Sequence, residues 1–238
     1  MNESAFVNQV RGLSAAEALP EDRAAFIRKT YIHLAGAVLL FGAIVSYLIG
    51  SGRGIWIAST MLSGPYSWLI VLAAFMGVSW LAQSWAQSST SKYMQYMGLL
   101  LFTLAESIIF LPLIYMAASQ SDGMSTILQA GVVTGGLFAG LSAVVFLTRK
   151  DFSFLGPILA IGGFVALGFI VSGIMFGFGL GSVFAFAMVA FAGGAILYET
   201  SNILHHYRTD QHVAASLGLF ASVALLFWYI LRIFMARD

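Results

Sequence analysis

The chain has 238 residues, of which 60% are hydrophobic and only 9% are charged. Soluble globular proteins carry about 25% charged residues, so this composition excludes an ordinary water-soluble domain and indicates lipid as the solvent. The net charge of +1 comes with no basic run, which excludes a nucleic-acid partner. Because the chain has no cysteine, disulfides, thiolate metal sites and cysteine nucleophiles are also excluded.

The first 24 residues are polar and mixed in charge. They lack the basic start, short apolar core and cleavage site of a signal peptide. We therefore expect residues 1–24 to form a cytoplasmic N-terminal tail and residues 25–238 to form one transmembrane domain. Pro20, followed by the acids Glu21 and Asp22, predicts the start of a helix.

Seven apolar runs are each long enough to cross a membrane as a helix, which takes about 20 residues. They are too long and too continuous for the alternating strands of a β-barrel. The fold class is therefore all-α, an integral membrane bundle of seven transmembrane helices. The runs are Thr30–Gly50, Pro65–Trp85, Tyr93–Ala117, Thr126–Thr148, Phe154–Met175, Ser182–Ile203 and Val213–Met235. The short glycine-rich stretch 176–181 predicts a tight hairpin, and Pro112 predicts a kink in the third run.

The positive charges predict the orientation of the bundle. With seven spans, eight of the Lys and Arg residues fall on the side of the N-terminus and three, namely Arg53, Arg232 and Arg237, fall on the other side. Because cytoplasmic loops carry the excess of Lys and Arg, we expect a cytoplasmic N-terminus.

Glycines recur at four-residue spacing within the fourth run and from the end of the fifth run into the hairpin stretch, which allows helices to approach closely. The examples are Gly131/Gly135, Gly136/Gly140 and Gly173/Gly177/Gly181. Packing within the bundle is the first interpretation of this spacing, and a dimer interface is the second.

Two acids, Glu106 and Glu199, lie inside apolar runs. An ionised carboxylate at the centre of a bilayer costs at least about 2.5–3.5 kcal/mol, so such residues usually face a bundle interior, a water-filled cavity or an ion path. Both are therefore candidate functional residues. The alternatives are that Glu199, near the end of its run, reaches the interface, and that Glu106 forms a structural hydrogen bond or ion pair.

Three segments together resemble one family. Residues 148–156 read TRKDFSFLG after Gly140 and Ser142, the third run contains Glu106 and Pro112, and residues 197–203 read LYETSNI. In this order they are similar to the motifs of the Bax inhibitor-1 family, in its bacterial branch. The resemblance covers about residues 25–236.

The resemblance implies a seven-helix bundle with the last helix at its centre, in the bacterial inner membrane. It also implies a pH-sensitive calcium leak whose sensor is a pair of acids, one on the sixth helix and one on the seventh. Bacterial relatives are in addition linked to the control of a membrane-bound ATP-dependent protease.

Carried over to this chain, the first acid of the pair is Glu199 and the second position is Ser222. The seventh run contains no acid, so the sensor lacks one carboxyl group. We expect Glu199 to meet the Ser222 hydroxyl, which can donate a hydrogen bond. One carboxylate is a poor calcium site, because calcium takes six to eight oxygen ligands.

Supporting roles fall to Tyr198 and Asn202, which flank Glu199, and to His206, which would share a helix face with it. The alternative for His206 is a solvated loop. Arg232 could pair with Glu106 or anchor in the headgroups. Asp151 is expected to cap the fifth helix.

Two other classes of membrane protein are excluded. A retinal protein needs a lysine in the last run, which has none, and an intramembrane protease needs a catalytic set that these runs do not contain. We therefore expect no enzyme activity, no cofactor and no metal site. The predicted function is a proton-modulated calcium or cation leak through Glu199, Ser222 and Glu106. The alternative is a non-conducting regulator that binds a membrane-bound ATP-dependent protease or another membrane protein.

Overall fold

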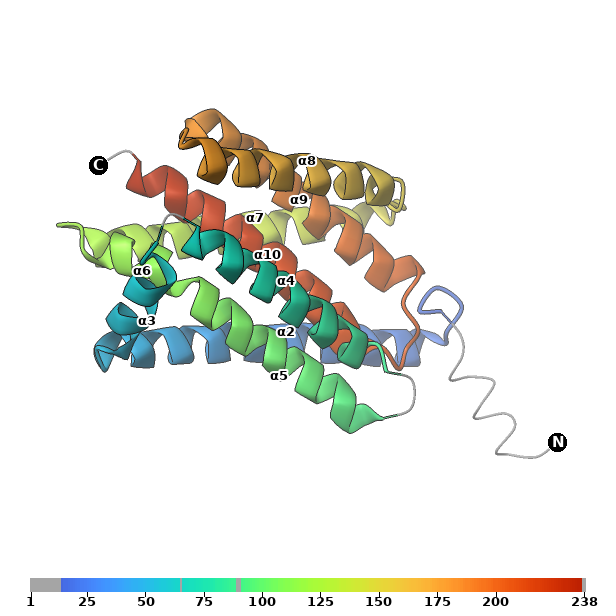
Figure 1. The fold of residues 1–238 in the computed structure, drawn as a ribbon. Coiled ribbons are helices and arrows are strands. Elements are labelled where there is room, and N and C mark those ends of the chain that lie inside the picture. The colour runs from blue at the N-terminus through green and yellow to red at the C-terminus, as the bar shows by residue number, and fades with distance from the viewer. Residues whose placement is uncertain (1–13, 65, 89–90, 237–238) are drawn as a thin grey trace.

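The computed structural model describes residues 14–64, 66–88 and 91–236. Most of the predicted tail, the start of the second run at Pro65, and Arg237 lie outside them. The described residues form a helical bundle (Figure 1). Its helices are α2 (Pro20–Gly50), α3 (Arg53–Met61), α4 (Ser67–Ala86), α5 (Lys92–Ile109), α6 (Leu111–Ala118), α7 (Gly123–Thr148), α8 (Leu155–Phe176), α9 (Gly181–His205) and α10 (His212–Met235).

Six of these helices are long and apolar enough to cross a membrane, and α5 with α6 makes a seventh span that is bent by 42°. The prediction of a seven-helix membrane bundle is confirmed. Helical spans suit lipid because each satisfies its own backbone hydrogen bonds. The bend lies where Pro112 was expected to kink the third run, since Pro112 sits at the start of α6.

Helix starts and turns follow local sequence signals. Pro20 opens α2 with two acids in its first turn, as predicted, so the helix runs across the expected boundary between residues 24 and 25. Gly177 and Gly181 take left-handed φ angles of 71° and 65° and make the predicted hairpin between α8 and α9. The short helix α3 was not predicted.

The last helix is the centre of the bundle. α10 packs against α2, α4, α5, α6, α7 and α9. In its most apolar window 67% of the residues are buried, against 22% or less in the other five helices that qualify alone. The expectation of a central last helix is confirmed, and α8, at 6%, is the most exposed of the six.

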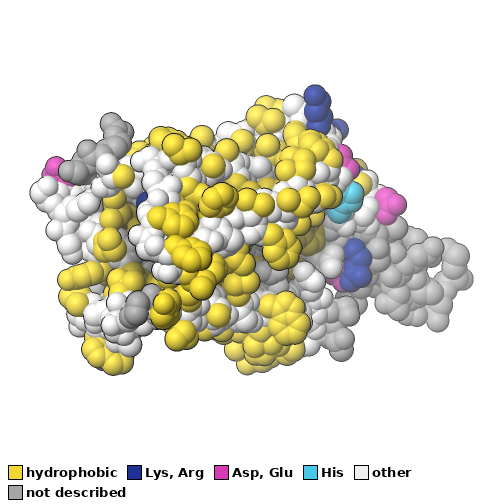
Figure 2. All heavy atoms as spheres, turned by 45° about the horizontal axis from the view of Figure 1, so that its top comes forward, with side chains coloured by type: hydrophobic (Ala, Val, Ile, Leu, Met, Phe, Trp, Pro, Cys, Tyr) yellow, Lys and Arg dark blue, Asp and Glu magenta, His cyan; other side chains and the backbone are white. Residues whose placement is uncertain are grey.

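Charged side chains gather at the two ends of the bundle. Figure 2 shows a hydrophobic face between them. We call the end where α2, α5, α8 and α10 begin the basic end; it carries Arg23, Lys92, Lys150 and Arg208. We call the opposite end, where α3 lies, the far end.

The expected intrabundle role of the glycine spacing is wrong for α7. A methyl group added at Gly131, Gly135, Gly136 or Gly140 would meet nothing within 4 Å. The close approach occurs at Gly98 instead, where a Cβ would lie 2.5 Å from the Ala82 carbonyl oxygen of α4. These α7 glycines therefore face away from the rest of the bundle.

Candidate functional site

Glu199 lies in the last two turns of α9, near the basic end, and is partly buried. Its Oε2 accepts a hydrogen bond from the Tyr207 hydroxyl at 3.3 Å. Tyr207 follows directly on the end of α9, where the Asn202 carbonyl accepts from the amides of His206 and Tyr207, both at 2.8 Å. This turn folds the tyrosine back over the helix that carries the acid.

Tyr207 stays a neutral donor in this position. Burial, followed by the negative charge and hydrogen bond of Glu199, raises the pKa of the Tyr207 phenol. The Tyr207 carbonyl accepts a hydrogen bond from the Ala15 amide at 2.8 Å, so the segment before α2 covers this corner of the bundle.

The other side of the Glu199 carboxyl group rests on α10 at Gly218. A Cβ at this position would lie 2.8 Å from Glu199 Oε2 and 2.9 Å from its Cδ. Only glycine leaves that room. Contact between α9 and α10 at this level therefore runs through the carboxyl group of Glu199 itself.

Ser222 does not meet Glu199 in the way that the sequence suggested. Its buried hydroxyl donates to the Gly218 carbonyl of its own helix at 3.0 Å. The hydroxyl on Glu199 belongs to Tyr207 instead. Gly218 and Ser222 are one turn apart and share a face of α10, so Ser222 remains adjacent to the site without bonding to the acid.

Two residues of the site, Tyr207 and Gly218, were missed by the sequence reasoning. A signal for Gly218 existed, because it lies one turn before Ser222 on the same face of the last run. No periodicity could identify Tyr207, since it lies beyond the helix end.

The supporting candidates lie around Glu199 without contacting its carboxyl group through a hydrogen bond. Tyr198 packs on the start of α8, where a Cβ at Gly156 would be 3.1 Å from its ring. Asn202 contributes its carbonyl to the helix end. His206 turns to Asp151, with 3.3 Å between His206 Nε2 and Asp151 Oδ2.

Asp151 ties the loop before α8 to α9. Its Oδ1 accepts from the Ser153 amide at 2.8 Å and from the Ser201 hydroxyl at 3.2 Å. The Ser153 amide, and then the side chains of Ser153 and His206, lower the pKa of Asp151 to about 2. The expected capping role of Asp151 is wrong, because the N-cap position of α8 is occupied by Phe154 and no side-chain hydrogen bond caps this helix.

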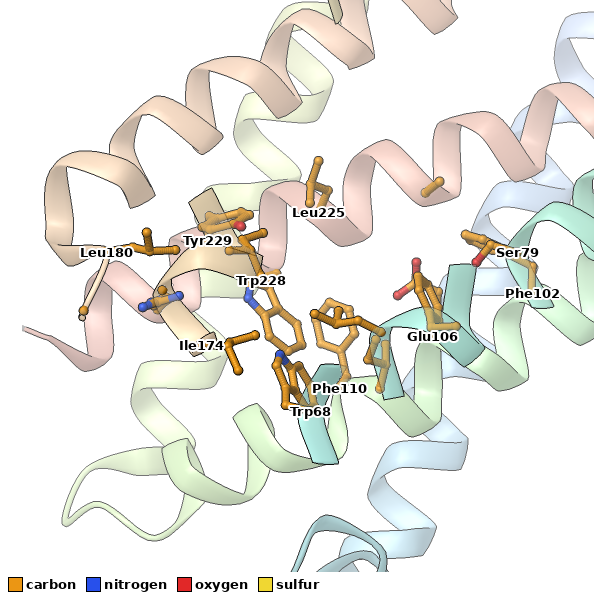
Figure 3. Close-up of a pocket in the computed structure, with 18 of the residues that line it drawn as sticks. Trp68, Ser79, Phe102, Glu106, Phe110, Ile174, Leu180, Leu225, Trp228 and Tyr229 are labelled. Atoms are coloured by element: carbon orange, nitrogen blue, oxygen red, sulfur yellow. The ribbon is translucent and has the colours of Figure 1, made fainter. Parts of the chain in front are cut away.

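The second intramembrane acid lies away from the first, in a cavity between α4, α5, α8 and α10. The cavity has a volume of about 540 Å³ (Figure 3). Glu106, on α5, is only 6% exposed and lines it. Within the described residues its carboxylate accepts no hydrogen bond and forms no ion pair. Arg232 lines the same cavity, is exposed, and does not pair with Glu106.

No three His, Asp or Glu side chains of the described residues lie close enough together to hold a metal ion. The site at Glu199 offers one carboxyl group, one phenol and a helix backbone. Chemically, this arrangement can hold or release a proton and can transmit that change to the contact between α9 and α10.

Comparison with known proteins agrees with the motifs. Residues 23–238 match the family model described as "Inhibitor of apoptosis-promoting Bax1". A protein of Pseudomonas aeruginosa described as uncharacterized is 31% identical over 229 residues, with 93% of this chain and 94% of the relative covered.

Two named relatives are also similar over most of their length. The Escherichia coli protein named "Modulator of FtsH protease YccA" is 31% identical over 221 residues, covering 89% of this chain and 91% of the relative. "Bax inhibitor 1" of Schizosaccharomyces pombe is 29% identical over 242 residues, covering 97% and 84%. With its central last helix and its acid on the sixth span, this multi-pass membrane protein belongs to the Bax inhibitor-1 family.

Proposed function

We propose that the chain is a protein of the bacterial inner membrane that binds and modulates a membrane-bound ATP-dependent protease. The observation that carries this proposal is the similarity, over about nine-tenths of both chains, to the Escherichia coli protein named as a modulator of FtsH protease. A relative from a second Escherichia coli strain, with the same percentage of identical residues, is named as an inner membrane protein.

The test reconstitutes the membrane protease of the source organism in liposomes, with and without this protein, and follows degradation of a labelled membrane substrate. A modulator changes the degradation rate in proportion to its amount and copurifies with the protease. An unrelated seven-helix protein at the same density controls for crowding. An unchanged rate together with no copurification would reject the proposal.

A second candidate function is a proton-modulated cation leak, calcium being the first ion to test. Two features favour it: the carboxyl group of Glu199 forms the contact between α9 and α10 at Gly218, and Glu106 lines a cavity beside α10. In this proposal, gain or loss of the Glu199 proton changes the packing of α10 and thereby the leak.

Calcium flux into liposomes, measured at acidic and at neutral pH, tests this second function. Glu199→Gln should remove most of the pH response while leaving the fold intact. Ser222→Asp places a second carboxyl group on the face of α10 that Gly218 shares, and should shift the response by coupling the two acids. Flux that is absent at both pH values, or a response that neither variant alters, excludes the leak.

A further inference from the structure

The cavity beside α10 has one carboxylate that the described part of the chain leaves without a partner. Glu106 is only 6% exposed, and it has no hydrogen-bond or ion-pair partner within the described chain. Figure 3 shows its carboxylate directed into the cavity. A buried carboxylate without a partner either takes up a proton or is paired by a group from outside the chain.

A second buried polar group lies beside the same cavity. The Ser79 hydroxyl on α4 is shielded from solvent and has no hydrogen-bond partner among the residues that the structure describes. Ser79 is only 9% exposed, and it lines the cavity with Glu106. Two unsatisfied polar groups on neighbouring helices, in a space of about 540 Å³, make a polar attachment point inside an otherwise apolar pocket.

The walls next to this point are aromatic. The rings of Trp68 and Trp228 stack with centroids 6.2 Å apart, and Phe110 meets Trp228 edge-on at 4.9 Å. All three line the cavity. Aromatic faces attract organic cations and bury their apolar parts. They offer nothing to a calcium ion, which needs six to eight oxygen ligands.

The remaining charge on the cavity lies at its other end. α5 and α10 both run from the basic end to the far end. The rings of Phe110 and Trp228 are in contact, so these two residues lie at the same level of the bundle. Glu106 lies one turn before Phe110, and Arg232 lies one turn after Trp228. About 12 Å of helix rise therefore separates the two charges. Arg232 is exposed, and its guanidinium therefore opposes a bound cation only weakly.

We propose that this cavity binds an organic monocation, an apolar or aromatic molecule whose single ammonium group sits against Glu106 and whose body packs on Trp68, Phe110 and Trp228. The proposal goes beyond both functions above, since neither a protease partner nor an inorganic cation requires an aromatic pocket. It depends on neither of them.

The test compares two probes of the same shape, benzyltrimethylammonium and its neutral analogue neopentylbenzene, in which carbon replaces nitrogen. Their binding to the full-length protein in lipid nanodiscs is measured by calorimetry, with empty nanodiscs as the blank. The wild type should prefer the cation. Glu106→Gln should weaken cation binding by about tenfold or more and leave neopentylbenzene binding unchanged.

Arg232→Gln is the matched variant at the other end of the same cavity. Removing its charge should tighten cation binding by about two- to tenfold, according to the dielectric between the two sites. Glu106→Asp keeps the charge and should keep the preference, which retains a test if the glutamine variant does not fold. An adequate fold is checked by thermal unfolding of each variant.

Three outcomes would overturn the proposal. Equal binding of the two probes to the wild type would remove the role of charge. An unchanged cation affinity in Glu106→Gln would remove the role of this residue. Displacement of the ammonium probe by an equimolar amount of calcium would make the cavity an inorganic cation site instead.

Discussion

At the scale of single residues, the candidate site depends on one carboxyl group that is held from two sides. Tyr207 donates to Glu199 from beyond the end of α9, and the backbone of α10 approaches the same group at Gly218. Neither partner carries a charge. Protonation or deprotonation of Glu199 therefore alters a hydrogen bond and a helix contact rather than an ion pair.

Gly218→Ala should displace this carboxyl group. The new methyl would lie 2.8 Å from Glu199 Oε2, and because that oxygen ends a flexible side chain, the side chain should move and lose the Tyr207 hydrogen bond. We expect a loss of about 1 kcal/mol in unfolding free energy, measured by thermal unfolding in detergent.

Two controls accompany the Gly218 variant. Gly131→Ala on α7, where a methyl meets nothing, should be neutral or slightly stabilising. In a Glu199→Ala background, Gly218→Ala should cost almost nothing, because the atom that it strikes is gone. A full cost in that background would show that the methyl acts on the helices and not on the carboxyl group.

Asp151 gives a pH prediction outside the membrane. Its pKa in the folded protein, about 2, lies below the ordinary value, so its hydrogen bonds to Ser153 and Ser201 stabilise the fold above about pH 4 and are lost as the pH falls toward 2. Asp151→Asn should lower the melting temperature slightly at neutral pH. Below about pH 4 the difference from the wild type should shrink. A difference that persists unchanged down to pH 2 would contradict the role of the Asp151 carboxylate.

At the scale of the helices, composition and apolar length predict the spans closely, since lipid requires long runs that satisfy their own hydrogen bonds. The break at Pro112 was predicted for the same local reason. Helix contacts were not, because four-residue spacing appears wherever glycines are frequent. The spacing on α7 faces away from the bundle, whereas Gly98, outside any repeat, makes the close approach to α4.

In the candidate site, too, the features that are local in sequence were predicted and those that depend on the fold were not. The motif around residue 199 identifies the acid, since it is local in sequence. The partner of the acid depends on how the chain turns after His205, where no pattern repeats. Ser222 was expected instead of Tyr207 because the position of the family's second acid falls on it. The cavity at Glu106 is formed by residues of four helices, so no single stretch of sequence predicts it.

Gly98→Ala should separate α4 from α5. The added methyl would lie 2.5 Å from the Ala82 carbonyl oxygen and 2.6 Å from the Ala86 amide nitrogen, and backbone atoms cannot swing aside. Overpacking of this kind costs about 1–3 kcal/mol, which thermal unfolding in detergent would detect. Gly140→Ala on α7 is the matched control, because its methyl enters open space. Equal stability of the two variants would contradict the close approach of α4 and α5.

At the scale of the whole molecule, the two ends of the bundle differ in charge. Of the nine Lys and Arg residues in the described part of the chain, seven belong to the segments of the basic end and two, Arg53 and Arg232, to those of the far end. Positive charge is retained on the cytoplasmic side during insertion. We therefore expect the basic end, with Glu199 and Tyr207, to face the cytoplasm, where a membrane-bound ATP-dependent protease hydrolyses its nucleotide.

The absence of native cysteine makes this orientation directly testable. Gln87→Cys places a thiol at the basic end, between α4 and α5, and Ser63→Cys places one at the far end, between α3 and α4; both positions are exposed. A membrane-impermeant maleimide added to spheroplasts should label position 63 and spare position 87 until the membrane is permeabilised. The reverse labelling pattern would show that the bundle has the opposite orientation in the membrane. It would then place Glu199 outside the cytoplasm, and the site could no longer respond to cytoplasmic pH or lie on the side of the membrane where the proposed partner hydrolyses ATP.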